Sequence, residues 1–218
     1  MATQIDAVIF DMDGVLCDSE ALICTSAVEM YRELGVTVQR EDFLPFVGTG
    51  EDRYIGGVAE KYGVNLNLAK AKERTYEIYL SLVPTQLEAF PGAVELVKQC
   101  RNAGLKSAVA SSADLVKIQA NLNKIGLPVE TWDAITSSED VVKKKPAPDI
   151  FLAAARKLSV SPQKCVVIED AVVGVEAARA AGMRCVAVAH TFAADKLAGA
   201  DLLRAKIAEV TLADLRGS

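Results

Sequence analysis

Asp6-Ala7-Val8-Ile9-Phe10-Asp11-Met12-Asp13-Gly14, close to the start of the chain, is the stretch around which the rest of this sequence is organised. An apolar run bounded by acidic residues is typical of a buried β-strand, and Asp11 and Asp13 would leave its carboxyl end on one side. Two carboxylates held close together repel each other, so one must take up a proton or a cation must lie between them. We expect that cation to be Mg²⁺. Taken alone, Asp-x-Asp at a strand end is equally consistent with a turn.

Three further polar positions decide between a turn and a functional site. Each comes after another predicted strand: Ser111, Lys145 and the pair Glu169-Asp170. Because ligands of open parallel sheets bind at the carboxyl ends of the strands, these residues are expected to meet Asp11 and Asp13 in one crevice. Their convergence favours a functional site.

Composition and charge exclude several classes of protein. The chain has 218 residues, 51% of them hydrophobic, so it can bury a core of its own. A formal charge of −5 leaves no basic stripe, and we expect no nucleic-acid partner. No apolar run is long enough to span a membrane and no signal-peptide pattern is present. The five cysteines show no paired spacing, which indicates free thiols in a reducing compartment, cytoplasmic or the chloroplast stroma.

The segment 18–86 is predicted to be helical throughout. Its patterns indicate helices at 19–34, 40–45, 51–62 and 67–82 and no convincing strand. We therefore expect a helical cap domain at 18–86, inserted into a core domain made of residues 1–17 and 87–218. The apolar positions of these helices are most simply the core of the cap itself: Val28, Tyr31, Leu34, Tyr54, Val58, Tyr62, Tyr76, Tyr79, Leu80 and Leu82.

From Phe90 onward, predicted helices alternate with predicted strands. The helices are 91–103, 114–125, 148–158 and 171–181, and the strands are 105–110, 134–136, 164–168 and 184–188. Such alternation indicates a parallel sheet with right-handed crossovers. The expected fold class is α/β, a Rossmann-like parallel sheet core with an inserted helical cap domain.

This set of side chains suits the hydrolysis of a phosphate monoester. Asp11 can attack phosphorus and form an aspartyl phosphate, and Asp13 can protonate the leaving alkoxide and later deprotonate the attacking water. Ser111 and Lys145 can hold and neutralise the phosphoryl oxygens. Mg²⁺ prefers oxygen ligands. We expect these from Asp11, the main-chain carbonyl of Asp13, and Asp170, with Glu169 either ligating the metal or steering Lys145.

The same residues carry a family resemblance. Four segments resemble, in order and context, the four motifs of the haloacid dehalogenase superfamily: Asp11-Met12-Asp13-Gly14, Ser111, Lys145-Pro146-Ala147-Pro148-Asp149 and Glu169-Asp170. The inserted helices resemble the cap of its β-phosphoglucomutase-like branch. Three longer segments are similar to the corresponding domain of the chloroplast suppressor-of-quenching proteins: 46–51, 109–114 and 166–171. The resemblance implies that the chain catalyses phosphoryl transfer as a phosphatase or a mutase, because family members that pump ions carry threonine where Asp13 stands.

Two departures from the pattern weaken the mutase alternative. True β-phosphoglucomutases carry a cap histidine where this chain has Ile23, and a cap arginine near the position of Glu51. Arg53 is a candidate replacement for that arginine. The prediction is a Mg²⁺-dependent phosphatase of a sugar or short-chain acid phosphate. The alternatives are a phosphosugar mutase and a module of a larger regulatory protein that acts mainly by binding a phosphorylated ligand or a protein.

Residues outside the four motifs complete the expected site. Gly48-Thr49-Gly50 is interpreted as a cap turn at the substrate opening, because it lacks the context of a nucleotide-binding loop. Substrate contacts are expected from Ser111, Ser112, Lys145, Gly48, Thr49 and Glu20. His190, the single histidine, is assigned a structural or surface role. We expect a monomer, or one domain of a larger protein.

Overall fold

The computed structural model describes residues 4–217 of the chain. Within this range all strands belong to one parallel sheet with the order β3-β2-β1-β4-β5-β6. The strands are β1 (Ala7–Phe10), β2 (Lys106–Ala110), β3 (Ala134–Thr136), β4 (Cys165–Glu169), β5 (Arg184–Val188) and β6 (Leu202–Arg204). The chain order reverses at β1, so the crevice of this doubly wound sheet lies beyond the carboxyl ends of β1 and its two neighbours. The predicted α/β class with a Rossmann-like sheet is confirmed.

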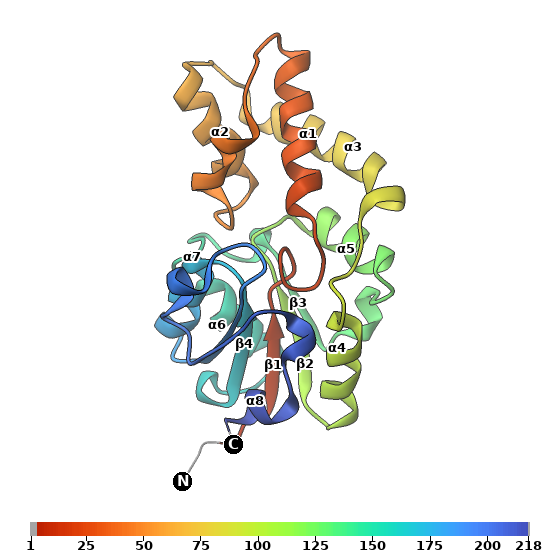
Figure 1. The fold of residues 1–218 in the computed structure, drawn as a ribbon, viewed down its shortest axis with the longest axis vertical. Helices are drawn as coiled ribbons and strands as arrows, with labels where there is room; N and C mark the ends of the chain where they lie inside the picture. Colours follow the sequence, from red (N-terminus) through yellow and green to blue (C-terminus); the bar gives the residue numbers. More distant parts are fainter. Residues whose placement is uncertain (1–3, 218) are drawn as a thin grey trace.

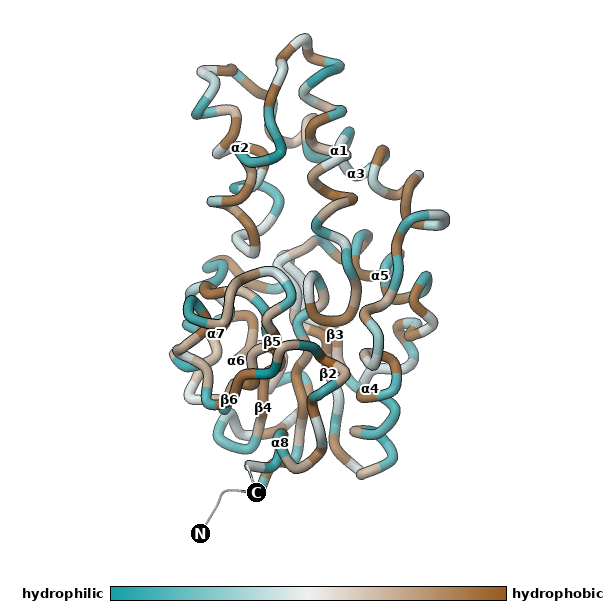
Figure 2. Tube along the Cα trace, in the orientation of Figure 1, coloured by the Kyte–Doolittle hydropathy of each residue, from teal (hydrophilic) through white to brown (hydrophobic). Residues whose placement is uncertain are grey.

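Five helices cover the two faces of the sheet. They are α4 (Ala93–Asn102), α5 (Leu115–Lys124), α6 (Asp149–Leu158), α7 (Val172–Ala180) and α8 (Leu212–Arg216). Successive strand residues point to opposite faces, so in β1 the side chains of Val8 and Phe10 join the cluster under α4, α5 and α8. Ala7 and Ile9 join the cluster under α6 and α7. Because both faces are covered, the central strands β1 and β4 are almost continuously apolar, and the sheet appears largely as brown tube in the lower half of Figure 2.

The chain between β1 and α4 forms a separate group of helices on the carboxyl side of the sheet (Figure 1). These cap helices are α1 (Glu20–Glu33), the 3₁₀ helix η1 (Arg40–Phe46), α2 (Glu51–Tyr62) and α3 (Leu68–Gln86). Five of the apolar positions predicted for the core of the cap are buried in one cluster, and three more are partly buried against it: Tyr31, Tyr54, Val58, Tyr76 and Tyr79, with Val28, Leu80 and Leu82. Two predicted positions are exposed instead. Leu34 is 54% exposed, because α1 ends at Glu33 and Leu34 lies in the turn that follows, and Tyr62 is 38% exposed, with its hydroxyl donating to Asp42.

Short 3₁₀ helices occupy the remaining connections. They are η2 (Val129–Thr131), η3 (Ser138–Asp140), η4 (Pro162–Lys164), η5 (Ala194–Leu197) and η6 (Ile207–Glu209). No helix within residues 4–217 combines the length and the apolar character needed to cross a membrane.

Three local differences separate the predicted elements from the observed ones. The edge strand β6 was not predicted, because its three residues are only partly buried and are ordered by pairing with β5 rather than by their own pattern. Helix α4 begins at Ala93 instead of Pro91, since Gly92 takes a left-handed conformation with φ 88°. Helix α3 continues to Gln86 through Pro84, four residues past the predicted end. The carbonyl of Pro84 accepts a hydrogen bond from Lys124 of α5.

Candidate active site

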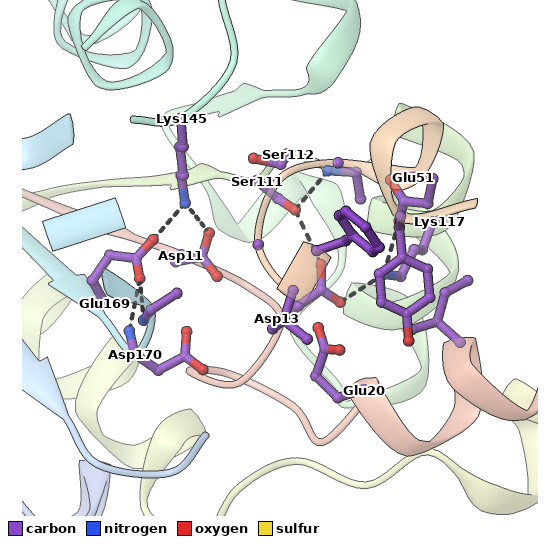
Figure 3. Close-up of a pocket in the computed structure, with 18 residues that line it drawn as sticks. Asp11, Asp13, Glu20, Glu51, Ser111, Ser112, Lys117, Lys145, Glu169 and Asp170 are labelled. Carbon is purple, nitrogen blue, oxygen red and sulfur yellow. Dashed lines mark hydrogen bonds and ion pairs between the residues drawn. The ribbon is translucent and has the colours of Figure 1, made fainter. Parts of the chain in front are cut away.

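The register of the sheet brings the predicted site residues to one edge. Phe10 of β1 pairs with Val109 of β2 and with Ile168 of β4. Asp11 and Glu169 therefore follow at the same level, and Ser111 follows one residue later on the other side of Asp11. Figure 3 shows these side chains converging on one pocket, together with Asp13, Lys145 and Asp170. The convergence expected from the sequence is thus present in the structure.

Lys145 forms a buried bridge between two carboxylates. Its ammonium lies 2.6 Å from Asp11 Oδ1 and 2.5 Å from Glu169 Oε1, and all three residues are at most 6% exposed. Burial alone would lower the pKa of Lys145, but the charges of Asp11 and Glu169 outweigh burial and raise it. Lys145 therefore remains a cation at neutral pH. For Asp11 burial dominates over the attraction of Lys145 and raises the pKa to about 8.

Glu169 is held by the backbone as well as by Lys145. Its Oε2 accepts hydrogen bonds from the amides of Asp170 at 2.8 Å and Ala171 at 2.7 Å, just before α7. The carboxylate lies directly against Gly174, where a Cβ atom would come within 1.8 Å of Oε1. Only glycine fits at that position of α7. Both oxygens of Glu169 are therefore engaged, Oε1 by the ammonium of Lys145 and Oε2 by the two amides.

Asp13 lies beside Asp11, at the meeting point of the core and the cap helices. Its Oδ2 accepts a hydrogen bond from Ser111 at 3.2 Å, and its Oδ1 accepts one from Ser19 and lies 3.0 Å from the ammonium of Lys117. Lys117 comes from α5 and is only 2% exposed. Its ammonium also contacts Glu51 Oε1 of α2 at 3.1 Å, so one cation joins Asp13 of the core to a carboxylate of the cap.

The cap side of the pocket holds two carboxyl groups whose pKa values are raised. Burial raises the pKa of Glu20, the first residue of α1, to about 7. Burial also raises the pKa of Glu51, although the charge of Lys117 opposes the shift. The pKa of Lys117 is raised, because Asp13 and Glu51 together outweigh the effect of its own burial. This side of the pocket is thus rich in oxygen atoms and poor in free positive charge.

The oxygen atoms around Asp11 and Asp170 fit a magnesium ion. Asp170 is 3% exposed, and its pKa is raised well above the usual value. Burial is the main cause, and the charges of Glu169 and Asp11 add to it. For Asp11, burial thus outweighs the attraction of Lys145, and no cation of the described chain pairs with Asp170. In residues 4–217 no three acidic, histidine or cysteine side chains form a ready-made cluster of ligands. Mg²⁺ needs none, since it binds through one or two carboxylates and completes its shell with carbonyl oxygens, phosphate and water.

A second glycine, Gly14, allows Asp170 to lie close to the loop that follows β1. Gly14 has φ 80°, and a Cβ atom there would come within 1.9 Å of Asp170 Oδ2. Its carbonyl accepts a hydrogen bond from His190 Nδ1 at 2.8 Å, while His190 Nε2 accepts one from the Ile207 amide. The histidine is therefore neutral with its proton on Nδ1, and it supports the loop that carries Asp13.

The pocket is closed over by the cap helices. Of the expected substrate contacts outside the motifs, Glu20, Gly48 and Ser112 line it, whereas the hydroxyl of Thr49 bonds back to the Phe46 carbonyl. The free volume is about 40 Å³, enough for a few water molecules but far below the ~300 Å³ or more of ligand pockets. The pocket in this arrangement is therefore too small to hold a phosphorylated metabolite.

Two basic residues differ from what the sequence suggested. Arg53 does not line the pocket; it is exposed, pairs with Glu60 at 2.8 Å and lies over the ring of Phe46. Lys117, which was not predicted, lies at the centre of the site. The available signal was that polar residues at helical spacing, Asp114, Lys117 and Asn121, begin just before helix α5 and continue along it.

Comparison with known proteins assigns the chain to a family. Residues 8–188 match the family described as "Haloacid dehalogenase-like hydrolase". The chain is 50% identical over 217 residues to Protein SUPPRESSOR OF QUENCHING 1, chloroplastic, of Arabidopsis thaliana, a match that covers 97% of this chain and 21% of that protein. The chain thus spans about a fifth of the length of that relative.

Relatives of similar length are also found. Hexitol phosphatase B of Escherichia coli is 34% identical, with 98% of each chain covered. The crystal structure of CbbY from Rhodobacter sphaeroides in complex with phosphate superimposes with a TM-score of 0.90 at 30% identity, covering 97% of this chain and 99% of that one. The sequence resemblance both to the superfamily and to the suppressor-of-quenching proteins is confirmed.

Proposed function

Since this chain belongs to the haloacid dehalogenase-like hydrolases, we propose that it is a Mg²⁺-dependent phosphatase that hydrolyses a small phosphorylated metabolite through an aspartyl phosphate. The observation that carries the proposal is the contact between Lys145 and Asp11. The ammonium holds Oδ1 at 2.6 Å, and no other hydrogen bond or ion pair of the described chain is assigned to Oδ2. One oxygen of a positioned carboxylate is thus available to attack, beside a cation that can bind a phosphoryl oxygen.

The first half-reaction uses Asp11 and Asp13. Asp11 Oδ2 attacks phosphorus, the ester P–O bond breaks, and the leaving alkoxide takes the proton carried by Asp13. Ser111 donates a hydrogen bond to a phosphoryl oxygen, and Lys145 neutralises charge that develops on the phosphoryl group. The Oγ of Ser112 is buried with no partner in the described chain, which leaves it available for a contact with the substrate.

The second half-reaction returns the enzyme to its starting state. Asp13 takes a proton from water, the hydroxide attacks phosphorus, and the P–O bond to Asp11 breaks to release inorganic phosphate. Asp11, Asp170 and the main-chain carbonyl of Asp13 would hold Mg²⁺, which supplies positive charge for the carboxylates and the phosphoryl oxygens. Glu169 keeps Lys145 in place throughout.

The arrangement of the helices supports a separate cap domain. We assign residues 18–86 to the cap and residues 1–17 and 87–218 to the core, and propose that the cap opens to admit substrate and closes to exclude water. The chloroplastic relative and the buried, unpaired cysteines support a chloroplast location. Within a longer protein the chain would act as one catalytic domain.

A panel of phosphate monoesters tests the proposal. Phosphate release is measured with Mg²⁺ for p-nitrophenyl phosphate, hexose phosphates, hexitol phosphates and 2-phosphoglycolate. Turnover of at least one ester that disappears in Asp11→Asn is expected. Absence of release from every ester, with a folded protein, would contradict phosphatase activity and leave the binding module as the better reading.

A further inference from the structure

We propose that Glu51 and Lys117 form a specificity pair that selects monophosphates with an uncharged, hydroxyl-bearing leaving group and rejects bisphosphates. This inference rests on the proposed phosphatase function and concerns the part of the substrate that is not transferred. The cap contributes the carboxylate of Glu51, and the core contributes the ammonium of Lys117 that faces it.

The first observation is an unused acceptor. Glu51 is 7% exposed, and its Oε1 lies 3.1 Å from the ammonium of Lys117. Its Oε2 is buried and has no hydrogen-bond partner in the described chain. A buried carboxylate oxygen without a donor is costly, so a ligand that supplies a hydrogen bond at this position gains free energy.

The second observation is an unused hydroxyl on the facing wall. Ser112 Oγ is also buried without a partner, and Ser112 and Glu51 line the same pocket. The turn before Glu51 approaches Ser112 closely, since a Cβ atom on Gly50 would lie 3.3 Å from the Ser112 carbonyl oxygen. A substrate hydroxyl can donate to Glu51 and exchange a hydrogen bond with Ser112, because it is both donor and acceptor.

The third observation is the charge of this side of the pocket. Lys117 is shared between Asp13 at 3.0 Å and Glu51 at 3.1 Å, and Lys145 is shared between Asp11 and Glu169. Among the residues that line the pocket these two lysines are the only cations, and each is already paired twice. A second phosphate would therefore meet Glu51 in a site of low dielectric without a free counter-charge, which repels it.

The pair also explains how the cap closes without a cation of its own. Lys117 belongs to α5 of the core, and Glu51 is the first residue of the cap helix α2. Their contact forms when the cap lies on the sheet, next to the acid/base carboxylate Asp13. The contact between Glu51 and Lys117 would therefore both close the site and recognise the leaving group.

Kinetics on matched substrates test the proposal. The value of kcat/KM is measured for glucose 6-phosphate, a hexitol monophosphate and glucose 1,6-bisphosphate, with p-nitrophenyl phosphate as a generic ester. The wild type is expected to prefer the monophosphates by about tenfold or more, since the like charge of Glu51 disfavours the bisphosphate. Glu51→Gln removes the charge and should reduce that preference by about tenfold. Glu73→Gln, which neutralises an exposed cap carboxylate outside the pocket, should leave it unchanged.

A shorter carboxylate separates attraction from repulsion. Glu51→Asp keeps the charge but withdraws the acceptor, so KM for the monophosphates should rise while the bisphosphate remains rejected. This variant also serves if Glu51→Gln does not fold. An unchanged substrate preference in the folded Glu51→Gln enzyme would overturn the specificity pair while leaving phosphatase activity intact.

Binding provides a readout that does not need turnover. In an Asp11→Asn background, calorimetry should show tighter binding of glucose 6-phosphate than of the bisphosphate, and adding Glu51→Gln should narrow the difference. Equal affinities in the presence of Glu51 would refute the inference. Loss of turnover on every ester, p-nitrophenyl phosphate included, would instead refute the proposed function.

Discussion

Replacement of Asp11 by asparagine should stabilise the metal-free protein while it removes activity. The amide is nearly isosteric with the carboxyl group, and its oxygen can still accept a hydrogen bond from Lys145. The reason for stabilisation is the pKa of Asp11, which burial raises from 3.8 to about 8. At neutral pH the group is largely protonated in the folded protein but ionised in the unfolded chain. This ionisation stabilises the unfolded state of the wild type, and asparagine, which cannot ionise, removes that stabilisation.

The magnitude follows from the two pKa values. The effect is absent below pH 3.8, grows as the pH rises and levels off near pH 8. At about 1.4 kcal/mol for each pKa unit, Asp11→Asn should raise the free energy of unfolding by up to about 4 kcal/mol at pH ~7. For a chain of this size that corresponds to an increase in Tm of about 10 °C. Added Mg²⁺ should reduce the difference, because it stabilises the ionised carboxylate of the wild type.

The single tryptophan provides the assay. Trp132 is buried with its ring 5.6 Å from that of Phe10, so its fluorescence reports whether the sheet around β1 is intact. Urea unfolding is followed in the presence of a chelator from about pH 4 to about pH 8. Asp18→Asn, at an exposed aspartate in the same loop, is the matched control and should change stability little at any pH.

Two results would refute this reasoning. If Asp11→Asn is no more stable than the wild type at neutral pH, Asp11 is not held in its neutral form by burial. If the purified variant still releases phosphate from esters, Asp11 is not the nucleophile. The expected loss of activity is at least about a thousandfold, as for other enzymes that lose a covalent nucleophile.

The remaining predictions concern the metal, the reaction outcome and the support of Lys145. Excess Ca²⁺ should inhibit the Mg²⁺-dependent activity, because Ca²⁺ takes more ligands at longer distances and misplaces the phosphoryl group; full activity after exhaustive chelation would contradict a metal requirement. Glucose 1-phosphate, if hydrolysed, should yield inorganic phosphate and no glucose 6-phosphate in a coupled assay, since Ile23 and Glu51 leave the cap without a cation for a bisphosphate intermediate; glucose 6-phosphate formed faster than phosphate would favour a mutase. Gly174→Ala should lower kcat by about tenfold or more and destabilise the fold by about 1–3 kcal/mol, because its Cβ atom would displace Glu169 from Lys145; a variant with unchanged kcat would show that this support is not needed.

Several features of the site could be predicted from the sequence because they depend on local patterns. Asp11, Ser111 and Glu169-Asp170 follow apolar runs whose periodicity indicates strands. Parallel strands place their carboxyl ends at one edge of the sheet, so the convergence of these residues follows from topology alone. The positions of α2, β3 and β5 also agree with the predicted ranges, since their boundaries coincide with turn residues or with changes in hydrophobic pattern.

Other features depend on contacts between distant segments and needed the tertiary structure. The polar stripe on α5 did not by itself place Lys117 in the site, because its partners Asp13 and Glu51 are far from it in sequence, and Glu51 meets it only when the cap lies on α5. Arg53 was a candidate by position, but its helix turns it toward Glu60 and solvent. The sequence thus determined the sheet and the residues at its edge, since these follow from local periodicity. Which charges face one another across the pocket was decided by the packing of the cap helices on the core, because that packing fixes the direction of each side chain.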